Sequence, residues 1–136
     1  MRIFVIYGNP KEGGFVHGAL DYLCERLVER DAEVERLRLL EAHIEECTGC
    51  FSCLKSGQCV IDDDMNEVYA RIRKADAYIT GASVRNGTVP ALFKKFYERI
   101  TYPIIFTRAL RDKHVLSIGA VGMATADSAA RPLVLQ

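Results

Sequence analysis

Residues 1–28 read MRIFVIYGNPKEGGFVHGALDYLCERLV and combine three patterns in a fixed order. Ile3 to Tyr7 is a continuous apolar run, which is typical of a parallel strand covered on both faces. Gly8-Asn9-Pro10 ends this run, and beyond Gly13-Gly14 the apolar residues recur with helical spacing. The stretch therefore predicts a buried strand, a glycine-containing loop and an amphipathic helix. The helical stripe comprises Val16, Leu20, Leu23, Cys24, Leu27 and Val28.

Three further strands are expected along the chain. Residues 33–39 alternate polar and apolar side chains, which indicates a strand at the edge of a sheet. Residues 77–81 and 115–121 are apolar and predict the other two, with a loop at 83–87. Each strand ends where a loop or a helix is expected to begin.

Two more helices are expected, at residues 65–72 and 88–101, where apolar side chains recur with helical spacing. Pro103 should end the second, because proline cannot continue the backbone hydrogen bonds of a helix. Asp62-Asp63-Asp64 precedes the first, so these carboxylates are expected to cap it and to complement its dipole.

Strands that alternate with helices predict a parallel sheet with right-handed crossovers and helices on both faces. We expect an α/β fold, a flavodoxin-like three-layer sandwich with strand order 2-1-3-4-5, in a single domain over residues 1–136. The chain after Val121 is short. The fifth strand is therefore expected to be truncated or missing, with Pro132–Leu135 as its stub.

The composition argues against nucleic-acid binding and membrane association. Lys and Arg together number 18 and so do Asp and Glu, which offers no general attraction for nucleic acid or an anionic membrane. No apolar run approaches the roughly 18–20 residues that span a bilayer, and the N-terminus has no signal-peptide pattern. We therefore expect a cytoplasmic protein that binds neither nucleic acid nor membrane.

The most informative chemistry lies in the cysteine segment, residues 47–59, which has the spacing Cys47-x2-Cys50-x2-Cys53-x5-Cys59. Four thiolates in one short segment match the ligand set of a [4Fe–4S] cluster. Structural zinc sites more often use two Cys-x2-Cys pairs that are further apart. Three interpretations stay open here: an iron–sulfur cluster, a zinc ion, or four free thiols. The fifth cysteine, Cys24, lies in the apolar helix stripe and is expected to be a small buried hydrophobe.

The loop between the first strand and its helix is a candidate phosphate site, because helix amides and the helix dipole face the carboxyl edge of the sheet there. Its sequence, GNPKEGGFV over residues 8–16, resembles the loop of NADPH-dependent FMN reductases and, within them, of iron–sulfur flavoproteins. In that family the loop wraps the FMN phosphate largely through main-chain amides. The resemblance implies that the phosphate contacts are Asn9, Lys11, Gly14, Phe15 and Val16.

Two positions of this loop depart from the family pattern. Asn9 replaces the usual serine, and Val16 replaces the usual threonine or serine. Each lost hydroxyl contact to a charged acceptor is worth about 1.5–3 kcal/mol. Weaker FMN binding is therefore expected.

A second segment, GASVRNGT over residues 81–88, resembles the family loop whose backbone touches the isoalloxazine ring of FMN. Arg85 and Asn86 stand where family members usually carry aromatic residues, so polar contact is expected to replace ring stacking. The cysteine segment resembles the run that carries a [4Fe–4S] cluster near the FMN of iron–sulfur flavoproteins. The ring contacts implied by the resemblance are Ser83, Val84, Arg85, Asn86, Gly87 and Thr88.

The resemblance implies an FMN-dependent oxidoreductase that takes electrons from NAD(P)H or a reduced carrier. The acceptor would be a small molecule, such as a quinone, a metal or oxygen, or a protein. No catalytic side chain is expected, because the flavin itself carries the hydride chemistry. Two alternatives stay open: a non-enzymatic electron-transfer flavoprotein and a zinc-stabilised binding module.

Tyr102-Pro103-Ile104-Ile105-Phe106 is an apolar stretch after the last expected helix. Burying it stabilises the protein by about 1.5–3 kcal/mol for each large side chain. A homodimer or higher even oligomer is expected, with this stretch at or beside the interface. The competing interpretation is that the stretch folds over the core of its own chain.

Overall fold

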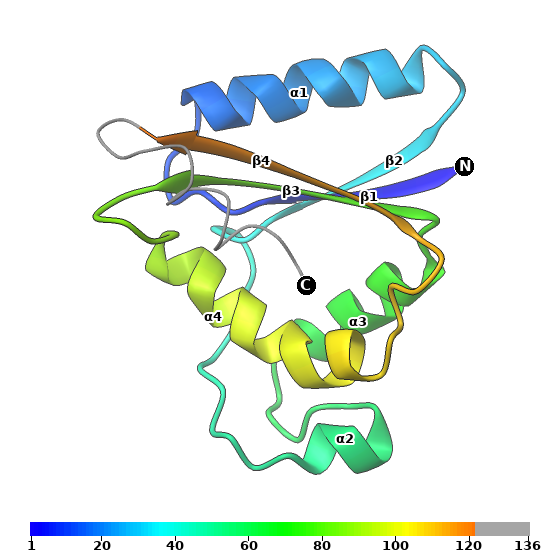
Figure 1. Cartoon of the computed structure of the whole chain (residues 1–136), viewed down its shortest axis with the longest axis vertical. Coiled ribbons are helices and arrows are strands. Elements are labelled where there is room, and N and C mark those ends of the chain that lie inside the picture. Colours follow the sequence, from blue (N-terminus) through cyan, green and yellow to red (C-terminus); the bar gives the residue numbers. More distant parts are fainter. Residues whose placement is uncertain (122–136) are drawn as a thin grey trace.

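The computed structural model describes residues 1–121. It contains a four-stranded parallel sheet in the order β2-β1-β3-β4, which confirms the predicted order (Figure 1). Pro132–Leu135, the expected stub of a fifth strand, lies outside the described residues. The described part of the chain holds no fifth strand, as expected for a truncated sheet. The strands are β1 Arg2–Tyr7, β2 Glu33–Arg38, β3 Ala77–Val84 and β4 His114–Val121.

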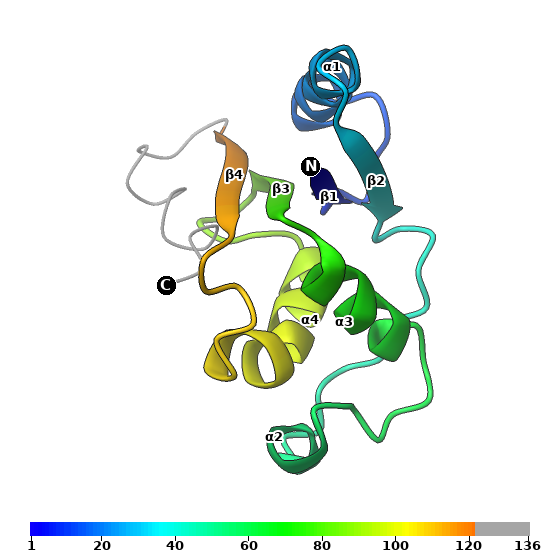
Figure 2. The same cartoon turned by 90° about the vertical axis from the view of Figure 1, so that its right-hand side faces the viewer.

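Helices cover both faces of this sheet. One helix, α1, packs on one face, and α3 and α4 pack on the other (Figures 1 and 2). A short helix, α2, lies in the cysteine segment, on the side of α3 and α4 that faces away from the sheet. No helix within residues 1–121 is long and apolar enough to cross a membrane. The helices are α1 Phe15–Val28, α2 Ser52–Ser56, α3 Met65–Lys74, α4 Ala91–Ile100 and the π-helix η1 Thr101–Phe106.

The core consists of two clusters, one on each face of the sheet. Strand β1 serves both, since Ile3 and Val5 point toward α1 while Phe4 and Ile6 point toward α3 and α4. This confirms the prediction of a doubly covered central strand. The apolar face predicted for α3 is also confirmed. Its buried residues are Met65, Val68, Tyr69 and Ile72.

Strand β3 is longer than the sequence predicts. Ser83 and Val84, expected in a loop, are its last residues and pair with Ala120 and Val121 of β4. The extension is stable because the neighbouring strand supplies backbone partners as far as this point. The candidate ring contacts therefore begin on the rigid sheet.

The expectation that Pro103 ends the second long helix is wrong. Helix α4 continues into the π-helix η1, which contains Pro103. Proline has no N–H group, so it cannot bond to the carbonyl of Arg99 four residues earlier. The hydroxyl of Tyr69 donates to that carbonyl instead, at 2.8 Å. A long-range side-chain contact thus replaces the missing helical bond.

The π-helix η1 also contains the apolar stretch that follows α4, residues 102–106. Pro103 and Ile104 are buried against the core of their own chain, as the competing interpretation expects. Phe106, in contrast, has 66% of its surface exposed. The stretch is therefore divided between the core and an open surface.

Candidate functional site

The loop after β1 contacts the end of β3 at the carboxyl edge of the sheet. The Gly8 N–H donates to the carbonyl oxygen of Gly81 at 2.7 Å. A Cβ atom at Gly8 would overlap the ring of Phe93 and lie 2.9 Å from that same carbonyl oxygen. Glycine is therefore required at position 8 so that the two backbones and α4 can approach this closely.

Asn9 connects the β1 loop directly to the end of β3. Its side-chain Oδ1 accepts a hydrogen bond from the Ser83 N–H at 2.7 Å. The sequence did not predict this contact, since only its resemblance to a phosphate-binding loop marked Asn9. The contact of Asn9 with a phosphate remains a prediction, but its amide already fixes the β1 loop against β3.

The start of α1 suits an anion. Gly14 precedes the helix in an extended conformation with no side-chain hydrogen bond capping the helix, and the first turn contains no acidic residue. The first amides and the positive end of the dipole are therefore left for a negatively charged group. Val16 is buried, with its Cγ1 packed closely against Gly81, so only its main chain can reach such a group. Lys11 and Phe15 are exposed beside the loop.

The second loop is a tight hairpin turn. The Arg85 N–H donates to the Thr88 carbonyl at 2.8 Å, and the Thr88 N–H donates back at 3.0 Å. Asn86 and Gly87 between them have φ angles of +50° and +76°, which Asn-Gly pairs adopt readily in such turns. All four residues are exposed. The turn is thus held by its own backbone and presents its tip outward.

The loops fit FMN on two counts. The first is the uncapped start of α1, which can bind a phosphate. The second is the Ser83 hydroxyl, whose oxygen is shielded from solvent and has no hydrogen-bond partner within residues 1–121. A buried polar atom without a partner costs about 1–3 kcal/mol, and a polar ligand edge at this place could satisfy it.

The four cysteines of the cysteine segment share one region without forming a metal cage. Burial raises the pKa of the Cys53 thiol first, and the charges of Cys59, Cys47 and Cys50 raise it further. The other three cysteines therefore lie near enough to Cys53 to affect its pKa. Within residues 1–121, however, no three or more His, Cys, Asp or Glu side chains are arranged to hold a metal ion. The donor set fits an iron–sulfur cluster in kind, but the predicted convergence on one centre is not formed in this structure.

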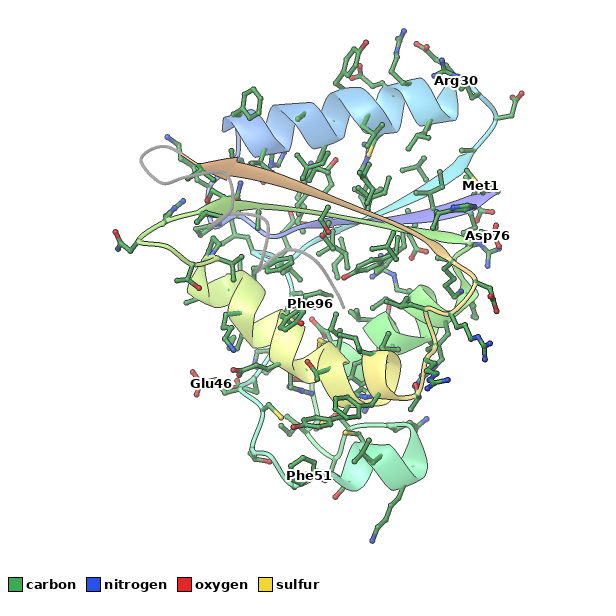
Figure 3. All side chains as sticks on the ribbon, in the orientation of Figure 1. Met1, Arg30, Glu46, Phe51, Asp76 and Phe96 are labelled. Carbon is green, nitrogen blue, oxygen red and sulfur yellow. The ribbon has the colours of Figure 1, made fainter. Side chains whose placement is uncertain are left out.

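The cysteine segment lies on the outer side of α4. Figure 3 shows Phe96 of α4 pointing toward the sheet, while Glu46 and Phe51 lie on the other side of that helix. The ring of Phe51 meets that of Tyr102 edge to face, with 4.9 Å between centroids. A hollow of about 400 Å³ lies between Glu46 and the exposed residues of α4.

The aspartates before α3 do more than the sequence predicts. Asp63 and Arg99 form a buried ion pair, with Arg99 Nη2 2.9 Å from Asp63 Oδ1 and Nη1 2.5 Å from Oδ2. Asp63 also accepts from the Met65 N–H, so part of the predicted capping is present. Asp64, the residue at the N-cap, makes no capping bond with its side chain and accepts from the His43 N–H instead. The sequence signal that could have revealed this ion pair is an arginine, Arg99, on the apolar face of α4.

Electrostatics favour this ion pair. Burial acts to raise the pKa of Asp63, but hydrogen bonds from Arg99 and from the Glu45 and Met65 amides outweigh it, so the pKa lies below its ordinary value. The Arg99 guanidinium also donates to the Glu45 carbonyl at 2.8 Å. The pair therefore fixes both ends of the cysteine segment to α4.

The model of the NADPH-dependent FMN reductase family matches residues 1–135. The chain belongs to this family. An iron-sulfur flavoprotein of Methanosarcina thermophila is 33% identical over 99 residues, which cover 73% of this chain and 52% of that protein. An iron-sulfur flavoprotein of Methanocaldococcus jannaschii is 34% identical over 128 residues, or 93% of this chain and 61% of that protein.

This FMN reductase family member thus spans about half to three fifths of the length of these two relatives. Its fold is similar to that of an NAD(P)H:quinone oxidoreductase from Methanothermobacter marburgensis, with a TM-score of 0.73 and 20% identity. The similarity covers 93% of this chain and 67% of that one. At this identity, the likeness supports the flavodoxin-like fold and nothing finer.

Replacing Asn9 by alanine is expected to weaken FMN binding by about threefold to tenfold. The variant loses the bond to the Ser83 N–H, and a neutral hydrogen bond contributes about 0.5–1.5 kcal/mol. Titration of FMN into the protein, followed by flavin fluorescence, measures the change. Glu67→Gln, at an exposed position of α3, is the control. Equal affinity in Asn9→Ala and wild type would show that the bridge does not shape the site.

Proposed function

We propose that residues 1–136 form one FMN-binding domain of an oxidoreductase that takes electrons from NAD(P)H or a reduced carrier. The electrons pass to a small-molecule or protein acceptor. The observation that carries this proposal is the attachment of the β1 loop, through Gly8 and Asn9, to the end of β3. In a sheet of this order, ligands bind at that edge, where the connections diverge. Membership of the FMN reductase family supports the choice of ligand.

In this proposal the protein binds and orients the cofactor. The first amides of α1 and the loop from Asn9 to Gly14 hold the phosphate, with Lys11 adding positive charge nearby. Residues 83–88, at the end of β3 and in the turn after it, would contact the ring. Bound FMN supplies the hydride and electron chemistry, so we assign no catalytic side chain.

We also propose that Cys47, Cys50, Cys53 and Cys59 hold a [4Fe–4S] cluster. The support is the donor set itself, the position of the four cysteines in one short segment and the iron–sulfur relatives. Each thiol would lose its proton on binding iron, because the thiolate is the ligand. The thiols must then move closer together than they are in this structure.

Assembly as a homodimer or higher even oligomer completes the proposal. Phe106 and Phe51 are more than half exposed beside Tyr102, and Val115 and Leu116 of the edge strand β4 are nearly half exposed. A second copy would remove these apolar surfaces from water. A mass of 15.2 kDa by light scattering at tens of micromolar would contradict this assembly. The cytoplasmic location expected from the sequence stays a prediction.

NADPH oxidation tests the enzymatic part of the proposal. With FMN bound, the protein should reduce a quinone at the expense of NADPH or NADH faster than free FMN does under the same conditions. Bound flavin that NAD(P)H reduces no faster than free FMN would instead indicate an electron carrier. The two outcomes are separated by stopped-flow absorbance of the flavin.

Iron analysis tests the cluster separately. After anaerobic reconstitution, about four irons and a matching amount of sulfide are expected per chain. Less than one iron per chain would refute the cluster, and stoichiometric zinc in the purified protein would favour a structural zinc site instead.

A further inference from the structure

The side chain of Asn66 makes two hydrogen bonds to the backbone of Cys59 in the cysteine segment. The Cys59 N–H donates to Asn66 Oδ1 at 2.8 Å, and Asn66 Nδ2 donates to the Cys59 carbonyl at 2.9 Å. Asn66 lies in the first turn of α3, whose apolar face is buried in the core. Two bonds to one residue fix both the position and the orientation of its backbone.

Side chains of α3 and α4 hold the neighbouring backbone as well. Arg73 of α3 donates through Nη2 to the Gly57 carbonyl at 2.8 Å, two residues before Cys59. The same nitrogen lies 3.1 Å from the Pro103 carbonyl in η1. On the other side, Asp63 is fixed by Arg99. Cys59 therefore lies in a part of the segment that is attached to the domain on both sides.

The other three cysteines lie in a different setting. Residues 46–56 make local bonds, such as Gly57 N–H to the Cys53 carbonyl at 2.9 Å, within the short helix α2. Within the described part of the chain, no hydrogen bond joins residues 46–56 to α3 or α4. They contact the domain by packing, in which α2 lies against η1 and the ring of Phe51 meets that of Tyr102 edge to face. Glu45, just before this half of the segment, is held by Asp63 and Arg99, but residues 46–56 themselves can shift without breaking a hydrogen bond to α3 or α4.

We propose that Asn66 is a positioning residue that fixes Cys59 as the anchoring thiolate, onto which Cys47, Cys50 and Cys53 close when iron binds. The inference rests on the proposed cluster and goes beyond it, because it assigns different roles to the four ligands. A ligand fixed in advance leaves less chain to order when the metal binds. Hydrogen-bonding partners of metal ligands typically change metal affinity by about 10–100-fold.

The metal-free protein tests the anchor by itself. In Asn66→Ala, the Cys59 amide should exchange its hydrogen about threefold to tenfold faster than in the wild type, since it loses its acceptor. Asn66→Asp keeps an acceptor for that amide and should restore most of the protection. Glu67→Gln, at the adjacent exposed position, should leave it unchanged. Unchanged exchange in Asn66→Ala would overturn the proposal, as would acceleration in all three variants.

The reconstituted protein tests what the anchor does for the cluster. Under challenge with an iron chelator, Asn66→Ala should lose its visible absorption about tenfold faster than the wild type. The metal-free variant should still unfold cooperatively, with its melting temperature lowered only by the loss of two hydrogen bonds, and its FMN affinity should match the wild type. Equal cluster lifetimes in Asn66→Ala and wild type would overturn the proposal.

The two proposals fail in different ways. A wild type that takes up no iron refutes the cluster, and the exchange of the Cys59 amide then decides the anchor alone. A wild type that takes up iron while Asn66→Ala retains it equally well refutes the anchor and leaves the cluster in place. If Asn66→Ala does not fold, Asn66→Asp takes its place in the test. This variant keeps one of the two bonds, so its cluster lifetime under chelator challenge should be shorter than in the wild type.

Discussion

Replacing Asp63 by alanine is expected to lower the free energy of unfolding by about 3–5 kcal/mol. The variant leaves the Arg99 guanidinium buried without its carboxylate, since this side chain is only 1% exposed. It also frees the Glu45 and Met65 amides that Asp63 accepts from. Urea unfolding followed by circular dichroism measures the loss. A variant as stable as the wild type would mean that the ion pair is not formed.

The double variant Asp63→Leu with Arg99→Met is the control for this prediction. Removing both charges avoids a lone buried charge, so the double variant should be more stable than Asp63→Ala. The Glu45 carbonyl and the Glu45 and Met65 amides still lose their partners, which leaves a residual cost of about 1–3 kcal/mol for each group that stays buried. A double variant less stable than the single one would show that the charge is not the reason for the loss.

The same ion pair should give the protein an acid-dependent stability. The pKa of Asp63 is lower in the folded state than its ordinary value of 3.8. Its contribution is therefore fully present above that value and is lost as the pH falls through the lower, folded-state pKa. The slope of unfolding free energy against pH in this acid range should be smaller in Asp63→Ala than in the wild type. Equal slopes would assign the acid dependence to other groups.

Replacing Gly8 by alanine is expected to abolish tight FMN binding and to destabilise the fold by about 1–3 kcal/mol. The added methyl would overlap the Phe93 ring and lie 2.9 Å from the Gly81 carbonyl oxygen. The β1 loop must then move away from β3, and the Gly8 N–H bond to that oxygen is lost. FMN titration and thermal unfolding measure the two effects.

Gly18→Ala is the matched control for this change. Gly18 lies in α1, and a Cβ atom there meets no atom within 4 Å. Alanine is favoured over glycine inside a helix by about 1 kcal/mol, so this variant should be as stable as the wild type or more so. Wild-type FMN affinity in Gly8→Ala would contradict the close approach of the two loops.

The sequence predicts the parts of the fold that depend on local pattern. The apolar run Ile3–Tyr7 indicates a strand with two covered faces, and the spacing of Met65, Val68, Tyr69 and Ile72 gives the buried face of α3. The strand order follows from these patterns together with the rules for crossovers. Such features need no knowledge of distant contacts.

Contacts between distant residues could not be predicted in this way. Asn9 and Ser83 are 74 residues apart, and Asp63 and Arg99 are 36 apart, so no local spacing links them. At Pro103, the hydroxyl that bonds to the free carbonyl of Arg99 comes from Tyr69, thirty residues before Arg99. In each case the partner of a polar group comes from an element that is distant in the sequence.

The cysteine segment shows a different limit. Its spacing indicates the kind of ligand set, but the positions of the thiols depend on what binds between them. Asn66 gave no signal in the sequence, because an asparagine in the first turn of a helix is ordinary. Its role appears only once the backbone of Cys59 is placed beside it.

Titration of FMN into the wild-type protein tests the central proposal most directly. If the β1 and β3 loops form a flavin site, flavin fluorescence should be quenched at micromolar concentrations and saturate at one FMN per chain. Gly8→Ala should show no such quenching under the same conditions, while Gly18→Ala should match the wild type. Unchanged fluorescence of FMN across the micromolar range in the wild type would contradict the proposal that this chain is a flavoprotein.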